Sequence, residues 1–576
     1  MADPLILASD RLAPAFAVVA GPDAGDVDPV VRPSERADAQ ANGALGLAKQ
    51  LGRPPREVAE AVVAAAGDLS DLGSVEIAGP GFINVTFADA FLGRELGTVS
   101  VDDHLGVRPA SRPETVVIDY SAPNVAKEMH VGHLRTTVIG DALVRLMTFL
   151  GHRVVRENHI GDWGTPFGML IEHLVDLGAS SEMELKDLDG FYREARAKFD
   201  ASDEFKERAR NRVVLLQSDD PDTMELWRIL VKQSTKHFNE VYDKLGVLLD
   251  DDDLAAESMY HPLLPDVIDR LDAAGLLEQS DGADVVFPPG YTNREGEPLP
   301  LIVRKRDGGF NYATSDLACV FDRVERVGAT LMLYVVGAPQ SLHLQMVWKV
   351  AEMAGWLVPP VRAVHVSFGN VLGADKKMLK SRSGDTMKFV ELLDEAVERA
   401  AAAVAAKNPN LSEAERAEVA EMIGIGAVKY ADLSTDRIKD YVFDWDRMLS
   451  FDGNTAPYLQ YAHARICSIF RRAGIERSAV RCVVPTIGEP QEHALALRIL
   501  AFDAAVWSTA DTYSPHKLCG YLFDLAQDFT AFYEACPVLK ADDAATRSSR
   551  LALCDLTARV LERGLDLLGI GAPERM

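Results

Sequence analysis

The chain contains few cysteines, and they are scattered. None of the six is separated from another by the two residues typical of zinc and redox sites. The sequence therefore encodes neither a zinc site nor a disulfide framework, and we expect reduced thiols in a cytoplasmic protein without a structural metal. The cysteines are Cys319, Cys467, Cys482, Cys519, Cys536 and Cys554.

Long hydrophobic runs are also missing. The longest, such as "LMLYVVGA" at 331–338, are much shorter than the roughly 20 apolar residues that cross a bilayer. The first residues, "MADPLILASDRLAP", carry Asp3, Asp10 and Arg11 where an export signal needs a continuous apolar stretch. We therefore expect neither a membrane partner nor export.

Positive charge is scarce, since 60 Lys and Arg oppose 87 Asp and Glu and give a net charge of −27. An acidic surface repels nucleic acid, so an RNA site would have to be a local basic patch. One stretch fits, because residues 455–482 hold five arginines and one glutamate. The alternative is a solvated basic helix face.

The pattern of 48% apolar and 26% charged residues is that of a globular protein, and 576 residues suffice for about three or four domains. Residues 1–108 read as a small α+β unit, with helices at 37–52 and 54–67 followed by strands at 74–79 and 82–87. The polar, proline-bearing segment 101–114 is typical of a linker.

A β-α-β unit begins at residue 115. The strand "TVVIDY" is followed by apolar residues at helical spacing from Leu134 to Leu150 and by the strand "HRVVREN". Parallel sheets of this kind bind ligands at the carboxyl ends of their strands. Residues 176–300 read as a charged helical insertion, and strands resume in 301–338.

Beyond residue 388 the chain reads as helical. Ser412 and Glu415 form the pattern of a capping box. An apolar stripe follows helical spacing and predicts the core of a bundle. The stripe consists of Leu518, Leu522, Leu525, Phe529 and Phe532.

Two histidines flank a glycine in "HVGH", at the junction of loop and helix. The free N–H groups of a helix start favour an anion, and glycine lets a flat ring or a phosphate approach the backbone. His130, Gly132 and His133 therefore predict a site for a nucleoside triphosphate. Either histidine alone would read better as a core residue.

A second segment, "GADKKMLKSRSGDTMKF" at 373–389, forms a cationic loop that can clamp a pyrophosphate as it leaves. The alternative is solvated surface. The residues assigned to this binding are Lys377, Met378, Lys380 and Ser381.

The two motifs together resemble the signature pair of class I aminoacyl-tRNA synthetases, His-Ile-Gly-His and Lys-Met-Ser-Lys-Ser. Further segments resemble the arginyl-tRNA synthetases over nearly the full chain: "SAPNVAKEMHVGHLRTTVIGD", "NYATSDLA", "YVVGAPQSLHLQ", "NTAPYLQYAHAR" and "LLGIGAPERM". Leu379 departs from the second motif. Ala37 and Ala39 depart where the family often has glycine and an aromatic residue, which leaves open how the N-terminal unit grips RNA.

The resemblance implies a multidomain protein of α/β and all-α parts. A Rossmann-like catalytic domain with a parallel sheet would occupy 109–388, with the insertion at 176–300. A tRNA-contacting α+β domain would occupy 1–108. A helical-bundle anticodon-binding domain would occupy 389–576, with its core at about 453–576. The protein would be a monomer.

The implied substrates are L-arginine, ATP with Mg²⁺ and tRNA(Arg), with no tightly bound cofactor. His130, His133, Lys377 and Lys380 would be the catalytic residues, acting on the phosphates. The carboxylate of arginine would attack the α-phosphorus of ATP, and a ribose hydroxyl of the tRNA would take the arginyl group. The implied tRNA-binding residues are Asn42, Arg465, Arg471 and Arg472.

An arginine site must also hold a planar guanidinium, which calls for carboxylates as forked acceptors and a ring to lie against. Asp119 at a strand end, with Tyr312 and Asp316 four residues apart on a predicted helix, offer these groups. By resemblance Asn124 and Gln340 would orient the head group and amine. The other implied arginine-binding residues are Ala122 and His343.

Two alternatives remain at this point. Another class I synthetase, such as the cysteinyl enzyme, would need zinc-binding cysteines that the spacing does not provide. A catalytically silent RNA-binding relative would not need the intact His130, His133, Lys377 and Lys380. A tRNA-charging assay across the twenty amino acids distinguishes the three.

Overall fold

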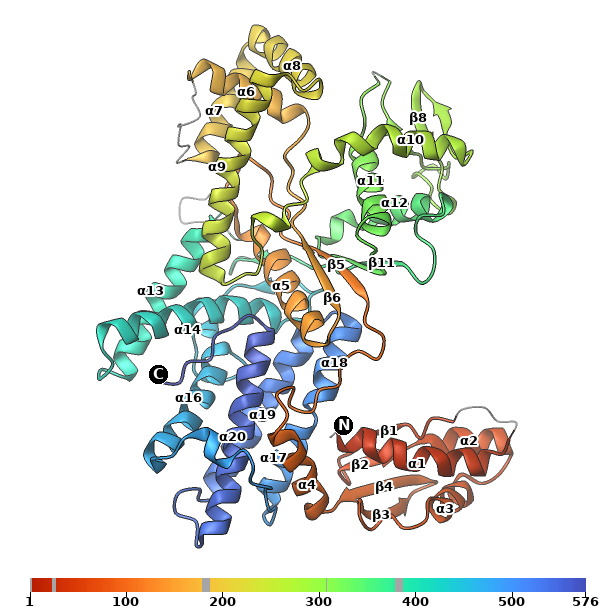
Figure 1. The fold of residues 1–576 in the computed structure, drawn as a ribbon, viewed down its shortest axis with the longest axis vertical. Coiled ribbons are helices and arrows are strands. Elements are labelled where there is room, and N and C mark those ends of the chain that lie inside the picture. The colour runs from red at the N-terminus through yellow and green to blue at the C-terminus, as the bar shows by residue number, and fades with distance from the viewer. Residues whose placement is uncertain (1–2, 23–26, 179–186, 307, 378, 380–386) are drawn as a thin grey trace. The chain divides into compact units, whose positions relative to one another are not determined.

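The structure is a computed structural model, which describes the chain except residues 1–2, 23–26, 179–186, 307, 378 and 380–386 (Figure 1). Internal contacts divide it into two compact units. The first unit comprises Met1–Pro109, Ser450–Asp566 and Gly571–Met576, and the second comprises Ala110–Leu449 and Leu567–Ile570. In the described parts of the chain, no helix combines the length and apolar character needed to cross a membrane.

The N-terminal part of the first unit is an antiparallel sheet of order β1-β2-β4-β3, against which three helices pack. Its core gathers Leu12, Phe16, Leu47, Val62 and Ile83. The elements are α1 (Pro4–Ala20), β1 (Val31–Pro33), β2 (Ala39–Ala41), α2 (Gly43–Leu51), α3 (Pro55–Ala66), β3 (Gly73–Ala78), β4 (Phe82–Phe87) and α4 (Asp89–Ser100).

The predicted start of the second helix, at residue 37, is wrong. Residues 39–41 form β2, which pairs with both β1 and β4, and helix α2 begins only at Gly43. The alanines there favour a helix locally, but two neighbouring strands outweigh a propensity of a few tenths of a kcal/mol per residue.

The C-terminal part of the first unit is helical. In α19 the predicted stripe is confirmed, because all five of its side chains are buried. The elements are α16 (Ala456–Ala473), η5 (Arg477–Val480), α17 (Pro490–Leu500), α18 (Phe502–Thr512), α19 (His516–Ala535) and α20 (Ala544–Leu567).

A parallel sheet of order β11-β10-β5-β6 organises the second unit. Helix α5 leads from β5 to β6, and α12 leads from β10 to β11, so the chain leaves the adjacent strands β5 and β10 toward opposite edges. This divergence makes a ligand site at their carboxyl ends. The elements are β5 (Thr115–Asp119), η1 (Val131–His133), α5 (Leu134–Phe149), β6 (Arg153–Glu157), α11 (Tyr312–Glu325), β10 (Leu331–Tyr334), η4 (Ala338–Gln340), α12 (Ser341–Met353) and β11 (Arg362–His365).

The insertion contains more than helices. Figure 1 shows the yellow helices α6–α9 apart from the green segment with β7–β9. Strands β7, β8 and β9 form an antiparallel sheet. The sequence did not predict β7 and β8, because they are short and β7 exposes polar side chains. In contrast, β9 begins at residue 301, where strands were expected to resume. The elements are α6 (Thr165–Asp176), α7 (Leu188–Ala201), α8 (Asp203–Gln217), α9 (Pro221–Leu245), η2 (Asp251–Asp253), η3 (Glu257–Leu263), α10 (Leu264–Ala273), β7 (Glu278–Ser280), β8 (Ala283–Val286) and β9 (Leu301–Arg304).

Two long helices complete the second unit. The capping box at the start of α14 is confirmed, since the Glu415 N–H donates to Ser412 Oγ over 3.2 Å and the Ser412 N–H donates to Glu415 Oε2 over 2.9 Å. The elements are β12 (Val371–Leu372), α13 (Phe389–Lys407), α14 (Glu413–Leu433), β13 (Tyr441–Val442) and α15 (Trp445–Met448).

Gly140 lets α5 approach the end of β5. A Cβ at this position would lie 2.3 Å from the Tyr120 side chain. Alanine is favoured over glycine in a helix by about 1 kcal/mol, whereas such a clash in a packed core costs about 1–3 kcal/mol. Gly140→Ala should therefore lower the thermal unfolding midpoint of the second unit. Gly520→Ala in α19, which meets no atom within 4 Å, should leave stability equal or higher; the reverse order would contradict this packing.

Candidate active site

The loop after β5 has an unusual backbone. Ser121, Ala122 and Ala126 adopt positive φ angles of 71°, 47° and 61°. Side chains from other elements hold their N–H groups, such as Asn158 Oδ1, which accepts from Ala122 over 3.0 Å, and Ser234 Oγ, which accepts from Ala126 over 2.9 Å. Positive φ in residues other than glycine is costly and gathers at functional sites.

His130 and His133 lie together at the start of α5, with ring centroids 4.3 Å apart. His130 Nδ1 accepts from the Gly132 N–H over 3.0 Å, and His133 Nδ1 accepts from the His130 N–H over 3.2 Å. A nitrogen that accepts carries no proton, so in both neutral rings the proton sits on Nε2. Each ring can thus offer an Nε2–H donor to a ligand.

Burial keeps these rings neutral. It lowers the pKa of His133 to about 4, helped by the neighbouring His130, and it lowers the pKa of His130 as well. The Gly132 position has no room for a side chain, because a Cβ would lie 2.6 Å from the His130 ring. The ring that lies against the backbone of Gly132 is therefore that of His130.

The second motif is described only in part. Lys377 is exposed, and its carbonyl accepts from the Gly373 N–H over 2.7 Å just after β12. Met378, Lys380 and Ser381 lie outside the described residues.

The chain that follows the second motif returns to the first. The Val131 N–H donates to Met387 O over 3.1 Å, and the Phe389 N–H donates to Met129 O over 3.0 Å. Lys388 Nζ lies 2.8 Å from Glu128 Oε2. Residues 129–131 and 387–389 are therefore direct neighbours where the chain enters η1, just before α5.

Three of the predicted arginine-binding residues come together from α11 and α12. His343 Nε2 lies 2.5 Å from Asp316 Oδ2, and the rings of Tyr312 and His343 are 4.8 Å apart. The Tyr312 side chain is largely exposed, whereas Asp316 and His343 are half-buried. A carboxylate beside two rings suits a flat cation.

The other predicted residues border the carboxyl ends of β5 and β10. Asn124 forms an isolated β-bridge with Gly161. The two residues are so close that a Cβ atom added at Gly161 would lie 2.4 Å from Asn124 Oδ1. Gln340 ends the short helix η4, which follows β10.

Asp119 has an internal partner that the sequence did not indicate. Its Oδ2 accepts from Arg323 Nη2 over 2.7 Å, and Arg323 Nε donates to Glu157 Oε2 over 2.7 Å. Arg323 is fully buried and faces the Tyr334 ring at 4.8 Å. Asp119 Oδ1 is buried and has no hydrogen-bond partner among the described residues. One oxygen of Asp119 is thus paired inside the protein, and the binding of a guanidinium by this carboxylate stays a prediction.

Glu257 is an acidic residue that the sequence reasoning missed. Its pKa is raised to about 7, chiefly by burial and also by the charges of Asp162 and Asp316, while His159 acts in the opposite direction. Asp316, at the predicted guanidinium site, is near enough to contribute to this shift of the Glu257 pKa. Glu257 stands alone in "LAAESMYHP", a stretch with no pattern that would have identified it.

The predicted RNA-binding arginines lie on α16 in the first unit. The Arg465 guanidinium lies 4.3 Å from the Tyr533 ring centroid, and Arg472 is exposed. Arg471 Nη1 donates to the carbonyl of Glu574 over 2.9 Å, so part of this side chain holds the C-terminal segment. Asn42 is the residue before α2, with a half-buried side chain.

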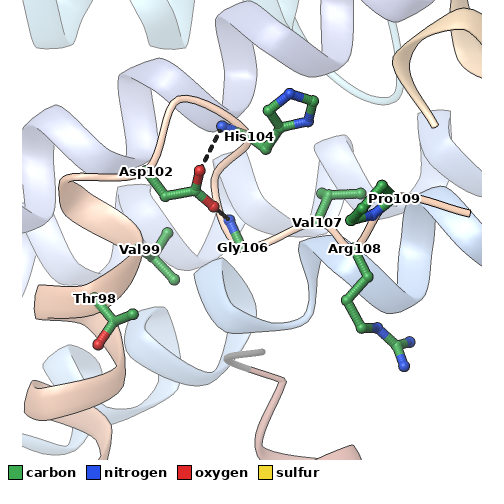
Figure 2. A pocket seen from close by; sticks show the side chains of 8 residues that line it. All are labelled: Thr98, Val99, Asp102, His104, Gly106, Val107, Arg108 and Pro109. Carbon is green, nitrogen blue, oxygen red and sulfur yellow. Dashed lines mark hydrogen bonds between the residues drawn. The ribbon is translucent and has the colours of Figure 1, made fainter. Parts of the chain in front are cut away.

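A pocket of about 340 Å³ lies at the end of α4 (Figure 2). The Asp102 carboxylate braces its loop by accepting from the N–H groups of His104 and Gly106 over 3.0 and 2.8 Å. None of the predicted site residues lines it. The lining residues are Thr98, Val99, Asp102, His104, Gly106, Val107, Arg108 and Pro109.

Three family models match the chain, and together they span nearly all of it. The model described as "tRNA synthetases class I (R), catalytic domain" matches residues 96–445. The "Arginyl tRNA synthetase N terminal domain" matches 8–87, and the "DALR anticodon binding domain" matches 459–576.

Individual proteins agree with the models. The chain is 56% identical to the arginine–tRNA ligase of Thermobifida fusca over 580 residues, 100% of each chain, and 49% identical to that of Edwardsiella ictaluri over 99% of each. The solved arginyl-tRNA synthetases of Plasmodium falciparum and Thermus thermophilus superpose with TM-scores of 0.84 and 0.82 at 27% and 26% identity, covering 99% of this chain and 99% and 100% of theirs. Both the predicted fold class and the resemblance drawn from the motifs are confirmed, and the chain belongs to the class I arginyl-tRNA synthetases.

Proposed function

We propose that this chain joins L-arginine to tRNA(Arg) in two steps, for protein synthesis. The arginine carboxylate attacks the α-phosphorus of ATP and forms arginyl-adenylate, while the bond to pyrophosphate breaks. A ribose hydroxyl of the terminal adenosine then attacks the arginyl carbonyl, its proton is lost, and AMP leaves. The observation that carries this proposal is the pairing of residues 129–131, which include His130, with residues 387–389, which follow the second motif. Charging tRNA with each of the twenty amino acids tests it, with arginine alone expected to react.

Neutral imidazoles would bind the phosphates. The Nε2–H groups of His130 and His133 can donate to phosphate oxygens at the start of α5, where the helix dipole also favours negative charge. Lys377 and Lys380 would neutralise the charge that develops on the leaving pyrophosphate, and Met378 and Ser381 would contribute to ATP binding.

Mg²⁺ would arrive with ATP. Among the described residues no group of three or more histidine, cysteine or acidic side chains could hold a metal ion. The phosphate oxygens of ATP are themselves good ligands for Mg²⁺.

The guanidinium of arginine would lie between carboxylates and rings. Asp316 and Glu257 supply acceptors, Asp119 Oδ1 supplies another, and Tyr312 with His343 provides flat faces. Ala122, Asn124 and Gln340 would hold the amine and carboxylate ends. Lysine cannot make the forked contact, and leaving such acceptors unpaired costs about 10⁴-fold in selectivity.

The helical part of the first unit would bind the anticodon, with Arg465 and Arg472 on its RNA-facing side. The N-terminal part, which includes Asn42, would touch the tRNA elbow. We further propose that the protein acts in the cytoplasm, which its six free thiols support, and that it is a monomer, as the family resemblance implies.

His133 should act as a hydrogen-bond donor. Replacing it by alanine removes one preorganised donor, worth about 3 kcal/mol of barrier, so arginine-dependent pyrophosphate exchange should slow about a hundredfold. His133→Asn should recover part of the rate. His152→Ala, which removes a ring that also accepts from a backbone N–H, should keep the full rate. A wild-type rate in His133→Ala would contradict the assignment.

Glu257 should make arginine use depend on pH. Because burial raises its pKa to about 7, the carboxyl is protonated below that pH and cannot attract the guanidinium. kcat/KM for arginine should therefore rise with pH and level off above 7, since this ratio reports groups of the free enzyme. Glu257→Gln should lower kcat/KM about tenfold or more and abolish this rise. Glu278→Gln on exposed β7 is the control; an unchanged profile in Glu257→Gln would exclude the role.

Arg472 should contribute a phosphate contact. Arg472→Ala should raise KM for tRNA with little change in KM for ATP, and it should reduce the slope of log affinity against log salt by about 1. Arg472→Lys keeps the charge and should stay close to wild type. Equal increases in both KM values would instead indicate damage to the fold.

A further inference from the structure

Arg135 is a buried arginine two residues after His133, in the first turn of α5. Its side chain is 1% exposed and that of Asp432 in α14 is 0% exposed. Arg135 Nε donates to Asp432 Oδ2 over 3.1 Å and to Oδ1 over 3.4 Å. Burying two charges costs much of what their attraction returns, so stability alone is a weak reason for this pair.

The rest of the guanidinium contacts two other segments of the chain. Arg135 Nη1 donates to the carbonyl of Lys439 over 2.9 Å. The guanidinium carbon lies 5.4 Å from the Tyr441 ring centroid and 5.9 Å from that of Phe368. Lys439 and Tyr441 belong to the segment that forms β13, and Phe368 precedes β12.

These two segments are fastened to each other. Strands β12 and β13 run parallel, with Val371 opposite Tyr441, and the Tyr441 N–H donates to Asn370 O over 3.1 Å. Gly369 comes so near the other segment that a Cβ would lie 2.8 Å from the carbonyl of Lys439.

Lys377 follows directly from this pair of strands. Gly373, the residue after β12, donates its N–H to the carbonyl of Lys377 over 2.7 Å. A continuous series of contacts thus joins the start of α5, where His133 lies, to the turn that carries Lys377.

We propose that Arg135 is a positioning residue, which fixes the β12–β13 pair, and with it Lys377, relative to His133. The proposal rests on the role proposed above for Lys377 in the reaction. The planar guanidinium bonds to Asp432 and to the carbonyl of Lys439 and lies close to two rings. Its fixed shape sets both distance and orientation, which an ammonium group cannot do. Precise placement matters because a shift of about 1 Å in a catalytic group can cost about a hundredfold in rate.

Combining variants at Arg135 and Lys377 tests the proposal in the full-length enzyme with tRNA present. Arg135→Lys should lower kcat of arginine-dependent pyrophosphate exchange about tenfold, through the displaced Lys377. In a Lys377→Ala background the same change should lower kcat less than about threefold, because the group it positions is gone. A full tenfold effect in both backgrounds would overturn the proposal.

A second variant separates position from stability. Arg135→Met with Asp432→Leu removes both charges and fills similar space, so the unfolding midpoint should stay near wild type while kcat falls as in Arg135→Lys. If this double variant keeps the wild-type kcat, Arg135 has no positioning role, even if Arg135→Lys fails to fold.

Arg145→Lys is the matched control, since Arg145 lies on the same helix and pairs with buried Asp141 over 2.9 Å. It should change stability but not kcat. A wild-type kcat in Lys377→Ala would remove the role proposed for Lys377 and this proposal with it. If Lys377→Ala lowers kcat, and the effects of the Arg135 and Lys377 changes multiply in the double variant, only the positioning role of Arg135 is overturned.

Discussion

The parallel pairing of β5 with β10 on one side and β6 on the other is the constraint on which the candidate site depends. The strand register places Asp119 of β5 opposite Tyr334 of β10 on one side and opposite Glu157 of β6 on the other. Because the three strands end at the same edge, the loops that follow them must share one space. The histidine pair enters that space after β5, and η4 enters it after β10.

Buried charge, rather than apolar packing alone, fixes how these elements meet. Arg323 joins the ends of β5 and β6 through Asp119 and Glu157. In α14, Lys429 is fully buried and donates to the carbonyls of Leu245 and Gly569 over 2.6 Å each. Burial lowers its pKa to about 8. Burying a charged side chain costs free energy, and its hydrogen bonds form only in a few geometries. Such side chains therefore fix the orientation of the elements they join more than they add to stability.

Burial lowers the pKa of His130 and His133 and raises the pKa of Glu257, and in each case it favours the uncharged form. The neutral histidines can act as directed hydrogen-bond donors, as the proposed contact with phosphate oxygens requires. Burial raises the pKa of Glu257 to about 7, and a neighbouring positive charge would favour its ionised form. Burial is therefore compatible with both proposed ligands, the triphosphate at the histidines and the guanidinium near Glu257.

The sequence by itself determined the features that depend on neighbours along the chain. The histidine pair at a helix start, the capping box at Ser412 and the apolar stripe of α19 follow from local spacing, and each lies in the element expected. Only the tertiary structure decided that residues 39–41 form a strand, that Arg323 donates a hydrogen bond to Asp119, and that burial raises the pKa of Glu257. Arg323 lies 204 residues from Asp119 and 166 from Glu157, and no local pattern encodes which distant segments pack together. Pairing between remote strands and burial of charge depend on that packing, which is why they emerged only with the fold.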